Sequence, residues 1–305
     1  MAAQLAIYSD FCDRGGEPRR WSRLAAQAGF THLHWGHEFA AEKPHTDAEL
    51  AEIGRWLKEE CLGVVDIHAS AGGRFQWTDP DDERRSTALE LVRDALRMHL
   101  AWNASGAIVA HPAYLDARKL VGDGGAEHRR EALLRYDAMR RSLDTLLPEF
   151  EAAHAVLALE NLPGDNGELL ERALAEYPTT ALGYCFDCGH ANLRAPADSY
   201  FIAERHAGRL AAIHLHDNDG EKDLHLPPLF DCGNVDWTRT LRIIRNSAYQ
   251  DILSFEFSMR SSHFHRPGVP DYNLPEAVIL DFLREAHRNC ARLAGLFADL
   301  PTAAQ

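Results

Sequence analysis

The sequence lacks long hydrophobic runs. No segment approaches the ~18 consecutive apolar residues that a membrane-spanning helix needs. The first residues, MAAQLAIYSDF, lack a basic start, and their apolar run is too short for a secretory signal peptide. We therefore expect a cytoplasmic protein with no membrane partner.

Positive charge is also scarce. The 305 residues include 32 Lys and Arg against 46 Asp and Glu, which leaves a formal net charge of -14. This surplus of negative charge repels phosphate backbones and anionic membrane surfaces. Nucleic acid is therefore a disfavoured partner.

Cysteine is sparse and scattered. The six cysteines, at positions 12, 61, 185, 188, 232 and 290, do not form the dense framework of a small secreted domain, so we expect reduced thiols. Cys185-x-x-Cys188 has a spacing found in redox and zinc sites. Strand alternation, however, points Cys185 and Asp187 to one face and places Cys188 in the following loop. We expect no joint role for the two thiols, and the role of Cys188 stays open.

The sequence does have a regular alternation of short apolar runs with longer amphipathic segments. Such alternation predicts a parallel sheet with both faces covered, and eight repeats favour a closed (β/α)8 TIM barrel over an open doubly wound sheet. The predicted strands are 5–11, 31–35, 63–69, 107–112, 155–161, 182–187, 210–217 and 252–257.

The predicted helices include residues 82–103 and 127–154, where apolar residues recur at spacings of three and four, and a last helix over 274–298. The length would also allow two modest domains. Because no low-complexity linker interrupts the alternation, we predict one α/β barrel domain over residues 1–305.

Acids and histidines stand at the ends of six successive predicted strands. Barrel enzymes build their sites at these carboxyl ends, where the strands converge. A buried polar group is costly without a partner, so six of them together indicate a shared ligand. Imidazole and carboxylate groups suit zinc, manganese, iron or cobalt better than a metal that prefers thiolates. The six residues are His68, His111, Glu160, Asp187, His214 and Glu256.

Two further elements extend this set. Asp187-x-x-His190 follows the sixth strand, and Asp223-x-His225 follows the seventh, which brings the candidate ligands to nine. His214 and His216 share a strand face, with His214 nearer the barrel interior. We expect His214 to be a ligand, whereas His216 either supports a ligand or belongs to the loop. Residues 217–220 have the composition of a turn.

The strand-end segments LALEN, FDCGH, IHLHDND with DLHLPP, and SFEF resemble the xylose-isomerase-like TIM-barrel superfamily. This superfamily includes sugar isomerases and epimerases, inosose dehydratases and endonuclease IV. Its epimerase branch implies one divalent metal held by Glu160, Asp187, His214 and Glu256, with Glu160 and Glu256 as catalytic acid and base. The endonuclease branch implies three zinc ions and adds His68, His111, His190, Asp223 and His225 as ligands.

Two departures from the family pattern bear on the substrate. Ketose 3-epimerases have an arginine six residues after the histidine of the seventh strand, and Gly220 stands there in this sequence. The D-x-H-x-P segment usually continues into a glycine-rich turn, whereas this chain keeps only Gly233 and has the bulky Leu229 and Phe230. We expect an altered pocket wall, and the missing arginine argues against a ketose C3 substrate.

The leading interpretation is a metal-dependent isomerase or epimerase of a small sugar, polyol or hydroxy-carbonyl compound, acting through an enediolate. We expect one divalent ion, up to three at most, of Zn, Mn, Mg, Fe or Co, and substrate contacts from His68, His111 and His190. The alternatives are a dehydratase or lyase of the inosose type, a zinc phosphoesterase resembling endonuclease IV, and a non-catalytic binding barrel. The sequence leaves open the exact substrate and whether the chain forms a homo-oligomer.

Overall fold

The computed structural model describes residues 3–12, 17–70, 74–193, 199–230 and 232–301. In this part of the chain, eight parallel strands pair in the order β7-β6-β5-β4-β3-β2-β1-β8. A parallel bridge between Leu215 and Phe255 connects the two outermost strands, so the predicted (β/α)8 barrel is confirmed. The strands are β1 (Leu5–Tyr8), β2 (His32–Trp35), β3 (Gly63–His68), β4 (Ile108–Ala110), β5 (Leu157–Glu160), β6 (Leu182–Asp187), β7 (Leu210–His214) and β8 (Leu253–Phe255).

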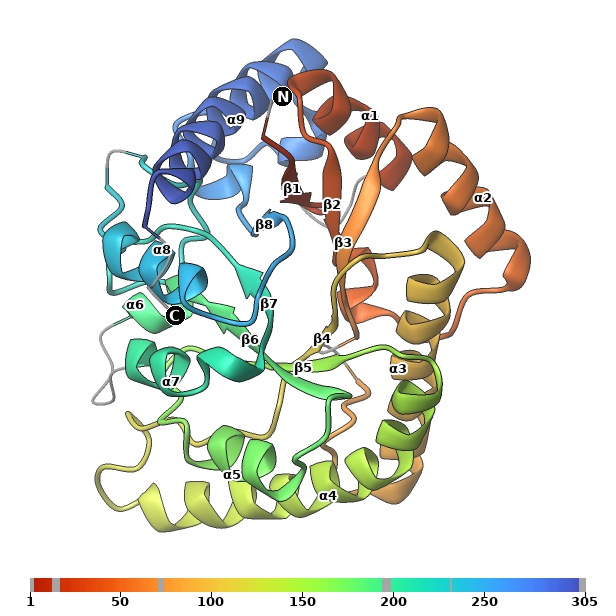
Figure 1. Cartoon of the computed structure of the whole chain (residues 1–305), viewed down its shortest axis with the longest axis vertical. Coiled ribbons are helices and arrows are strands. Elements are labelled where there is room, and N and C mark those ends of the chain that lie inside the picture. Colours follow the sequence, from red (N-terminus) through yellow and green to blue (C-terminus); the bar gives the residue numbers. More distant parts are fainter. Residues whose placement is uncertain (1–2, 13–16, 71–73, 194–198, 231, 302–305) are drawn as a thin grey trace.

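The helices surround the strands as a ring (Figure 1), with α9 packed beside α1. The three helices predicted from the sequence correspond to α3, α4 and α9. The described helices are α1 (Pro18–Ala28), α2 (Asp47–Glu59), α3 (Asp82–Trp102), α4 (Gly125–Ala152), α5 (Glu168–Glu176), α6 (Cys188–Asn192), α7 (Ser199–Arg205), α8 (Trp237–Arg245) and α9 (Glu276–Ala298). Short 3-10 helices are η1 (His37–Ala40), η2 (Ala207–Arg209), η3 (Met259–Ser261) and η4 (Asp271–Asn273).

Polar side chains fix where several helices begin. Thr46 accepts a hydrogen bond from the backbone N–H of Glu49, and Glu49 accepts one in return, so α2 starts with a capping box. Asp81 and Asp236 cap α3 and α8 in the same way, each accepting from a backbone N–H three residues later at 2.9 Å. These caps set the length of the loops that lead from the strands to the helices.

The core has two layers that the sheet separates. A large apolar cluster fills the space between the strands and the helices. A second, small cluster alternates with it along the central strands, and strand alternation therefore places it inside the barrel. Its buried members are Ala107, Val109, Ala158, Cys185 and Ala212. Because these side chains are small, the barrel interior leaves room for polar groups above them.

Six strands, β1, β3, β4, β5, β7 and β8, end earlier than predicted at the carboxyl end of the barrel, and three of these ends bear on the site. Ladder pairing stops at Ala110, His214 and Phe255, because the chains diverge into loops there. After β7, for example, Asp217 pairs instead with Leu226 in an antiparallel bridge. His111, His216 and Glu256 therefore lie just beyond strands rather than in them.

All six cysteines are free, as the scattered spacing predicted. Cys185 lies in the barrel interior and Cys188 begins α6, and both thiols are buried. None of the helices in the described ranges combines the length and hydropathy needed to cross a membrane.

Candidate metal centre

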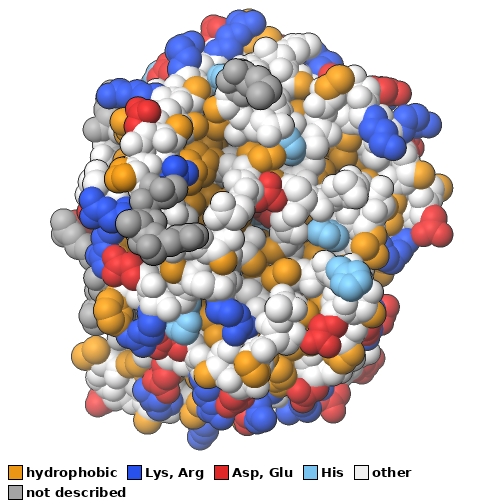
Figure 2. Space-filling view, viewed as in Figure 1, with side chains coloured by type: hydrophobic (Ala, Val, Ile, Leu, Met, Phe, Trp, Pro, Cys, Tyr) orange, Lys and Arg blue, Asp and Glu red, His pale blue; other side chains and the backbone are white. Residues whose placement is uncertain are grey.

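The carboxyl ends of the strands surround a cavity of about 690 Å³. Its wall includes Glu160, His190, Asp223, His225 and Glu256. Histidine and acidic side chains lie near the middle of the face viewed in Figure 2, and most basic side chains lie towards the periphery. Six of the nine predicted ligands therefore line one open cavity: His111, Glu160, His190, Asp223, His225 and Glu256.

Four strand-end residues form what we call the central cluster: Glu160, Asp187, His214 and Glu256. Each offers one ligand atom, and these four atoms lie within 4.8 Å of one another. His214 Nδ1 lies 2.9 Å from Glu160 Oε1 and 2.8 Å from Glu256 Oε2. The two glutamates predicted as acid and base therefore face the same imidazole nitrogen.

The central cluster attracts positive charge. Burial disfavours the charged form of Glu160, but the neighbouring His214, His111 and His68 outweigh this effect and hold the pKa of Glu160 well below its usual range. Burial also opposes protonation of His214, yet Cys185, Glu256 and Glu160 together raise its pKa well above the ordinary value. In the metal-free protein this positive charge is a proton on His214.

A side cluster shares Glu160 with the central cluster. Glu160 Oε2 lies 3.3 Å from His68 Nε2 and 3.1 Å from His111 Nε2. The Nδ1–H of His68 donates to the carbonyl of Ala69 at 2.8 Å, which leaves Nε2 directed at the glutamate. Glu160 therefore has one oxygen towards each cluster.

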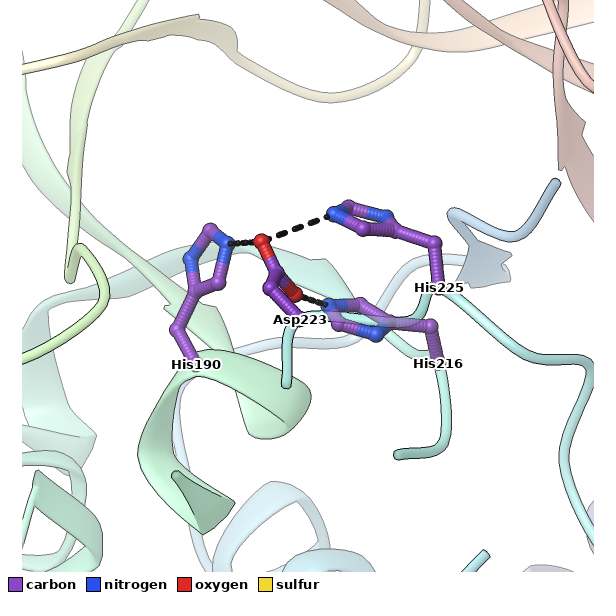
Figure 3. Close-up of side chains that lie close together, drawn as sticks. All are labelled: His190, His216, Asp223 and His225. Atoms are coloured by element: carbon purple, nitrogen blue, oxygen red, sulfur yellow. Dashed lines mark hydrogen bonds and ion pairs between the residues drawn. The ribbon is translucent and has the colours of Figure 1, made fainter. Parts of the chain in front are cut away.

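The outer cluster consists of His190, His216, Asp223 and His225 (Figure 3), whose ligand atoms also lie within 4.8 Å of one another. Asp223 Oδ2 lies 3.3 Å from His190 Nε2 and 3.2 Å from His225 Nε2. The rings of His216 and His225 are stacked, with centroids 3.9 Å apart. Burial disfavours a charged His225, but Asp223 raises the pKa of His225 to about 9.

Backbone carbonyls orient two imidazoles of the outer cluster. The Nδ1–H of His190 donates to Asn161 at 2.8 Å, and that of His225 donates to Glu256 at 2.9 Å. In both His190 and His225 the other ring nitrogen, Nε2, faces Asp223. Histidines that bind metals characteristically donate the other ring N–H in this way, because it fixes the tautomer and the ring orientation.

Asp187 links the central and outer clusters. Its carboxylate caps α6 by accepting from the backbone N–H of His190 at 2.7 Å. The same carboxylate lies 3.0 Å from His216 Nε2. The sequence left open whether His216 supports a ligand or belongs to the loop; the structure places it as a buried member of the outer cluster.

The loop that carries Asp223 and His225 is anchored by Asp217. This buried carboxylate accepts hydrogen bonds from the backbone N–H of Leu229 at 3.3 Å and of Val235 at 3.1 Å, and from the indole of Trp237 at 3.1 Å. His225 and Leu229 adopt positive φ angles of 46° and 63°, which non-glycine residues rarely do. Asp217 therefore does more than the simple turn role that we expected from the sequence.

Gly220 occupies a left-handed turn with a φ of 78°. Its N–H donates to Asn218 Oδ1 at 2.9 Å, and a Cβ at this position would lie 3.4 Å from the Asn234 side chain. An arginine would be strained in this conformation. The backbone conformation of this loop therefore disfavours the arginine that ketose 3-epimerases have at this position.

The donor set fits a divalent ion. His214 Nε2, His216 Nδ1 and Glu256 Oε2 are buried side-chain atoms that find no hydrogen-bond partner among the described residues. Neutral imidazoles and ionised carboxylates at ligand-to-ligand spacing match the preferences of zinc, manganese, iron and cobalt. Glu160, Asp187, His214 and Glu256 would hold the ion of the central cluster.

Sequence reasoning missed two residues beneath the central cluster, His34 on β2 and Asp66 on β3. Both are buried, and the Nδ1–H of His34 donates to Asp66. The signals were a histidine and a carboxylate inside apolar runs, THLHW and GVVDIHA, where burying a polar group is costly. They were passed over because neither stands at the end of its strand.

Comparison with known proteins gives relatives over nearly the whole chain. The uncharacterised protein y4fM of Sinorhizobium fredii is 29% identical over 283 residues, which is 84% of this chain and 88% of that protein. A crystal structure of D-psicose 3-epimerase in the presence of D-fructose superposes with a TM-score of 0.67 at 14% identity, covering 96% of this chain and 99% of the epimerase.

The structure of the IolI protein with a bound zinc atom also superposes with a TM-score of 0.67 at 14% identity, covering 97% of this chain and 100% of IolI. At these identities the similarity shows a common fold. The profile of the family described as "Xylose isomerase-like TIM barrel" matches residues 22–284. The chain belongs to this family, as the strand-end segments predicted.

Proposed function

We propose that the protein is a divalent-metal-dependent isomerase or epimerase of a small sugar, polyol or related hydroxy-carbonyl compound. The observation that carries the proposal is the arrangement of Glu160 and Glu256, whose carboxylates both face His214 Nδ1 at the floor of the cavity. Family membership and the epimerase fold agree with this chemistry. The cavity is open and large enough for a monosaccharide.

Proton transfer next to a carbonyl needs a base and an acid on a fixed scaffold. Glu256 follows β8 and Glu160 ends β5, so both are held by strand ends. Glu256 would take the proton from the carbon, and Glu160 would return one. A divalent ion in the central cluster would polarise the carbonyl and stabilise the negative charge of the enediolate.

The histidines around the cavity would orient the hydroxyl groups of the substrate. His111 and His190 line the wall near Glu160. His68 lies deeper and is 1% exposed, so it reaches the substrate only through its contact with Glu160. Of the three histidines predicted to bind substrate, we therefore keep His111 and His190 in that role.

Metal analysis followed by solvent deuterium exchange tests this function. The purified protein is loaded with Mn²⁺, Co²⁺ or Zn²⁺ and incubated in D₂O with a panel of sugars and inososes. We expect deuterium to enter the carbon next to the carbonyl of at least one compound. Turnover without deuterium incorporation would replace the enediolate route by a hydride shift, and loss of water from an inosose would identify the dehydratase alternative.

A zinc phosphoesterase is the second candidate. Glu160 belongs to both the central and the side cluster, and Asp187 connects the central cluster to the outer cluster. Together the three clusters contain all nine ligands that the endonuclease branch implies. The charge of the protein opposes it. Arg260 is the only lysine or arginine among the described residues that line the cavity, whereas duplex DNA needs several basic contacts. Incision of an abasic duplex by the zinc-loaded protein would reverse this ranking.

A further inference from the structure

A second histidine from inside the barrel faces the central cluster. His34 lies on β2, and one of its ring nitrogens lies within 4.8 Å of ligand atoms of both His214 and Glu256. The rings of His34 and His214 are 4.3 Å apart between centroids at an angle of 71°. No residue of β2 belongs to the set of ligands that the family resemblance implies.

The tautomer of His34 is fixed by Asp66. The two residues are directly opposite in the parallel pairing of β2 with β3, and a register shift between Leu33 and His34 brings them into line. Such irregularities re-aim side chains near active sites. Because the Nδ1–H of His34 donates to Asp66, its Nε2 carries a lone pair directed away from the carboxylate.

That lone pair is unsatisfied within the described structure. His34 Nε2, His214 Nε2 and Glu256 Oε2 are all buried, and none has a hydrogen-bond partner. Glu256 Oε2 lies 2.8 Å from His214 Nδ1 but without the geometry of a hydrogen bond. Three unpartnered polar atoms in one buried place are costly unless a further group satisfies them. A cation satisfies all three, because each offers a lone pair once the cation has displaced the extra proton of His214.

The arrangement of His34 repeats that of the other candidate ligands. His68, His190 and His225 donate their Nδ1–H to a backbone carbonyl and present Nε2 to a carboxylate of the site. His34 donates to a carboxylate instead, which fixes its tautomer and ring orientation in the same way. The side chain is fully buried and cannot contact bulk water. A purely structural histidine at this depth would use both ring nitrogens in hydrogen bonds.

From this geometry we propose that His34 is an additional protein ligand of the divalent ion in the central cluster and that Asp66 positions it. The inference rests on the proposed function, since it requires an ion at that place. It adds a neutral imidazole to a site of three carboxylates and one histidine. A second nitrogen donor shifts the preference of the site away from Mg²⁺ and towards Zn²⁺, Co²⁺ or Mn²⁺.

Binding of Co²⁺ tests the proposal, because visible absorption of the bound ion responds to the number and type of its ligands. The central site is identified as the part of the spectrum that His214→Ala removes. We compare the wild type with His34→Gln and Asp66→Asn, and with His32→Gln as a matched control. His32 stands two residues earlier on the same strand and belongs to none of the candidate ligand groups found in the described residues.

We expect His34→Gln to weaken Co²⁺ binding at the central site by more than ~100-fold and to change the absorption spectrum of the bound ion. Asp66→Asn should weaken Co²⁺ binding by ~10 to 100-fold and leave the spectrum nearly unchanged. His32→Gln should change neither property. Circular dichroism of the metal-free proteins checks folding. If His34→Gln does not fold, Asp66→Asn carries the test alone.

Wild-type affinity and spectrum in His34→Gln, or wild-type affinity in a folded Asp66→Asn protein, would overturn the proposal. The two levels of inference can be told apart. A wild-type protein that binds no divalent ion would refute the proposed function together with this ligand. A wild-type protein that binds Co²⁺ through His214 but is indifferent to His34 would refute only the additional ligand.

Discussion

The central and outer clusters offer similar donor atoms on different scaffolds. The central residues stand at or just after the ends of β5 to β8, where the barrel ladder fixes them. The outer residues come from the short helix α6 and from the loop after β7 (Figure 3). The two outer residues on the long loop are also more exposed: the side chains of Asp223 and His225 are 31% and 27% exposed, whereas that of Glu256 is 12% exposed.

Because of this difference in scaffold, we expect the central cluster to supply the chemistry and the geometry of the outer cluster to vary more. Sites on strands hold their geometry more closely than sites on loops. The central cluster also contains the two carboxylates that face one imidazole nitrogen. The outer cluster has three imidazoles around one carboxylate, so its metal affinity depends more on pH and on the loop. Each prediction below separates the two clusters.

The largest effect should come from the central cluster. Glu256→Gln keeps an oxygen near the metal but removes the basic carboxylate, so we expect turnover to fall by ~10² to 10⁴, the usual share of general acid–base catalysis. The other carboxylates should keep part of the metal affinity. Deuterium should enter the substrate in the wild type and fail to enter in the variant. If excess metal restored full activity, Glu256 would be a ligand only and Glu160 would be the next candidate for the base.

The anchor of the outer loop should matter less. The buried carboxylate of Asp217 accepts hydrogen bonds from Leu229, Val235 and Trp237. Asp217→Asn weakens these contacts, so we expect the loop to become less well fixed and the outer ion to bind ~10 to 100-fold more weakly. The number of bound ions at fixed free metal should fall by one. Asp219→Asn is the matched control, because Asp219 lies on the same loop and accepts only from its exposed turn. Equal losses at the central and outer sites would contradict the separation of the clusters.

The outer cluster should respond to pH with a defined sign. Its metal ligands must be neutral imidazoles, and Asp223 raises the pKa of His225 to about 9 against the effect of burial. Protons therefore compete with the metal below that pH, and we expect Co²⁺ affinity at the outer site to rise by about tenfold per pH unit between pH 6.5 and 9 for this ring. Calorimetric titrations across this range measure the slope. A slope of zero would show that His225 is not a ligand.

The metal-free protein should show the opposite dependence. Because the folded-state pKa of His225 is raised, the protonated ring stabilises the fold fully below pH 6.5, and this contribution is lost as the pH rises through about 9. Thermal unfolding of chelator-treated protein follows this loss, and His225→Gln should flatten the profile.

The smallest effect concerns nucleic acid. With a net charge of -14, the protein should show no salt-sensitive affinity for duplex DNA at moderate ionic strength, whether or not the outer cluster is loaded. Fluorescence anisotropy of a labelled abasic duplex measures this directly. Tight binding that weakens steeply with salt would assign the outer cluster to a phosphodiester.

Much of the site could be predicted from the sequence because a parallel barrel brings the carboxyl ends of its strands together. On that basis six strand-end residues were placed in one group: His68, His111, Glu160, Asp187, His214 and Glu256. The four that the family resemblance singled out, Glu160, Asp187, His214 and Glu256, each offer one ligand atom, and these atoms lie within 4.8 Å of one another. Apolar spacing predicted the bounds of α3, α4 and α9 to within two residues.

Other features depend on three-dimensional detail. His34 lies opposite Asp66 only because the pairing of β2 with β3 shifts register between Leu33 and His34. No pattern of residue types in the sequence predicts this shift. The position of His216 depends on how the following loop folds back, and the hydrogen bonds of Asp217 control that path. The predicted strand ends were too long because apolar runs continue past the last ladder pair into the loops.

Anomalous X-ray diffraction from crystals loaded with one equivalent of Mn²⁺ tests the central claim most directly. We expect a single strong peak between Glu160, Asp187, His214 and Glu256, with the ligand oxygens and nitrogens at about 2.0 to 2.3 Å, as usual for first-row divalent ions in such sites. The same crystals soaked with an active substrate should show its oxygens beside that peak. A peak confined to His190, Asp223 and His225, or no peak at all, would contradict the account.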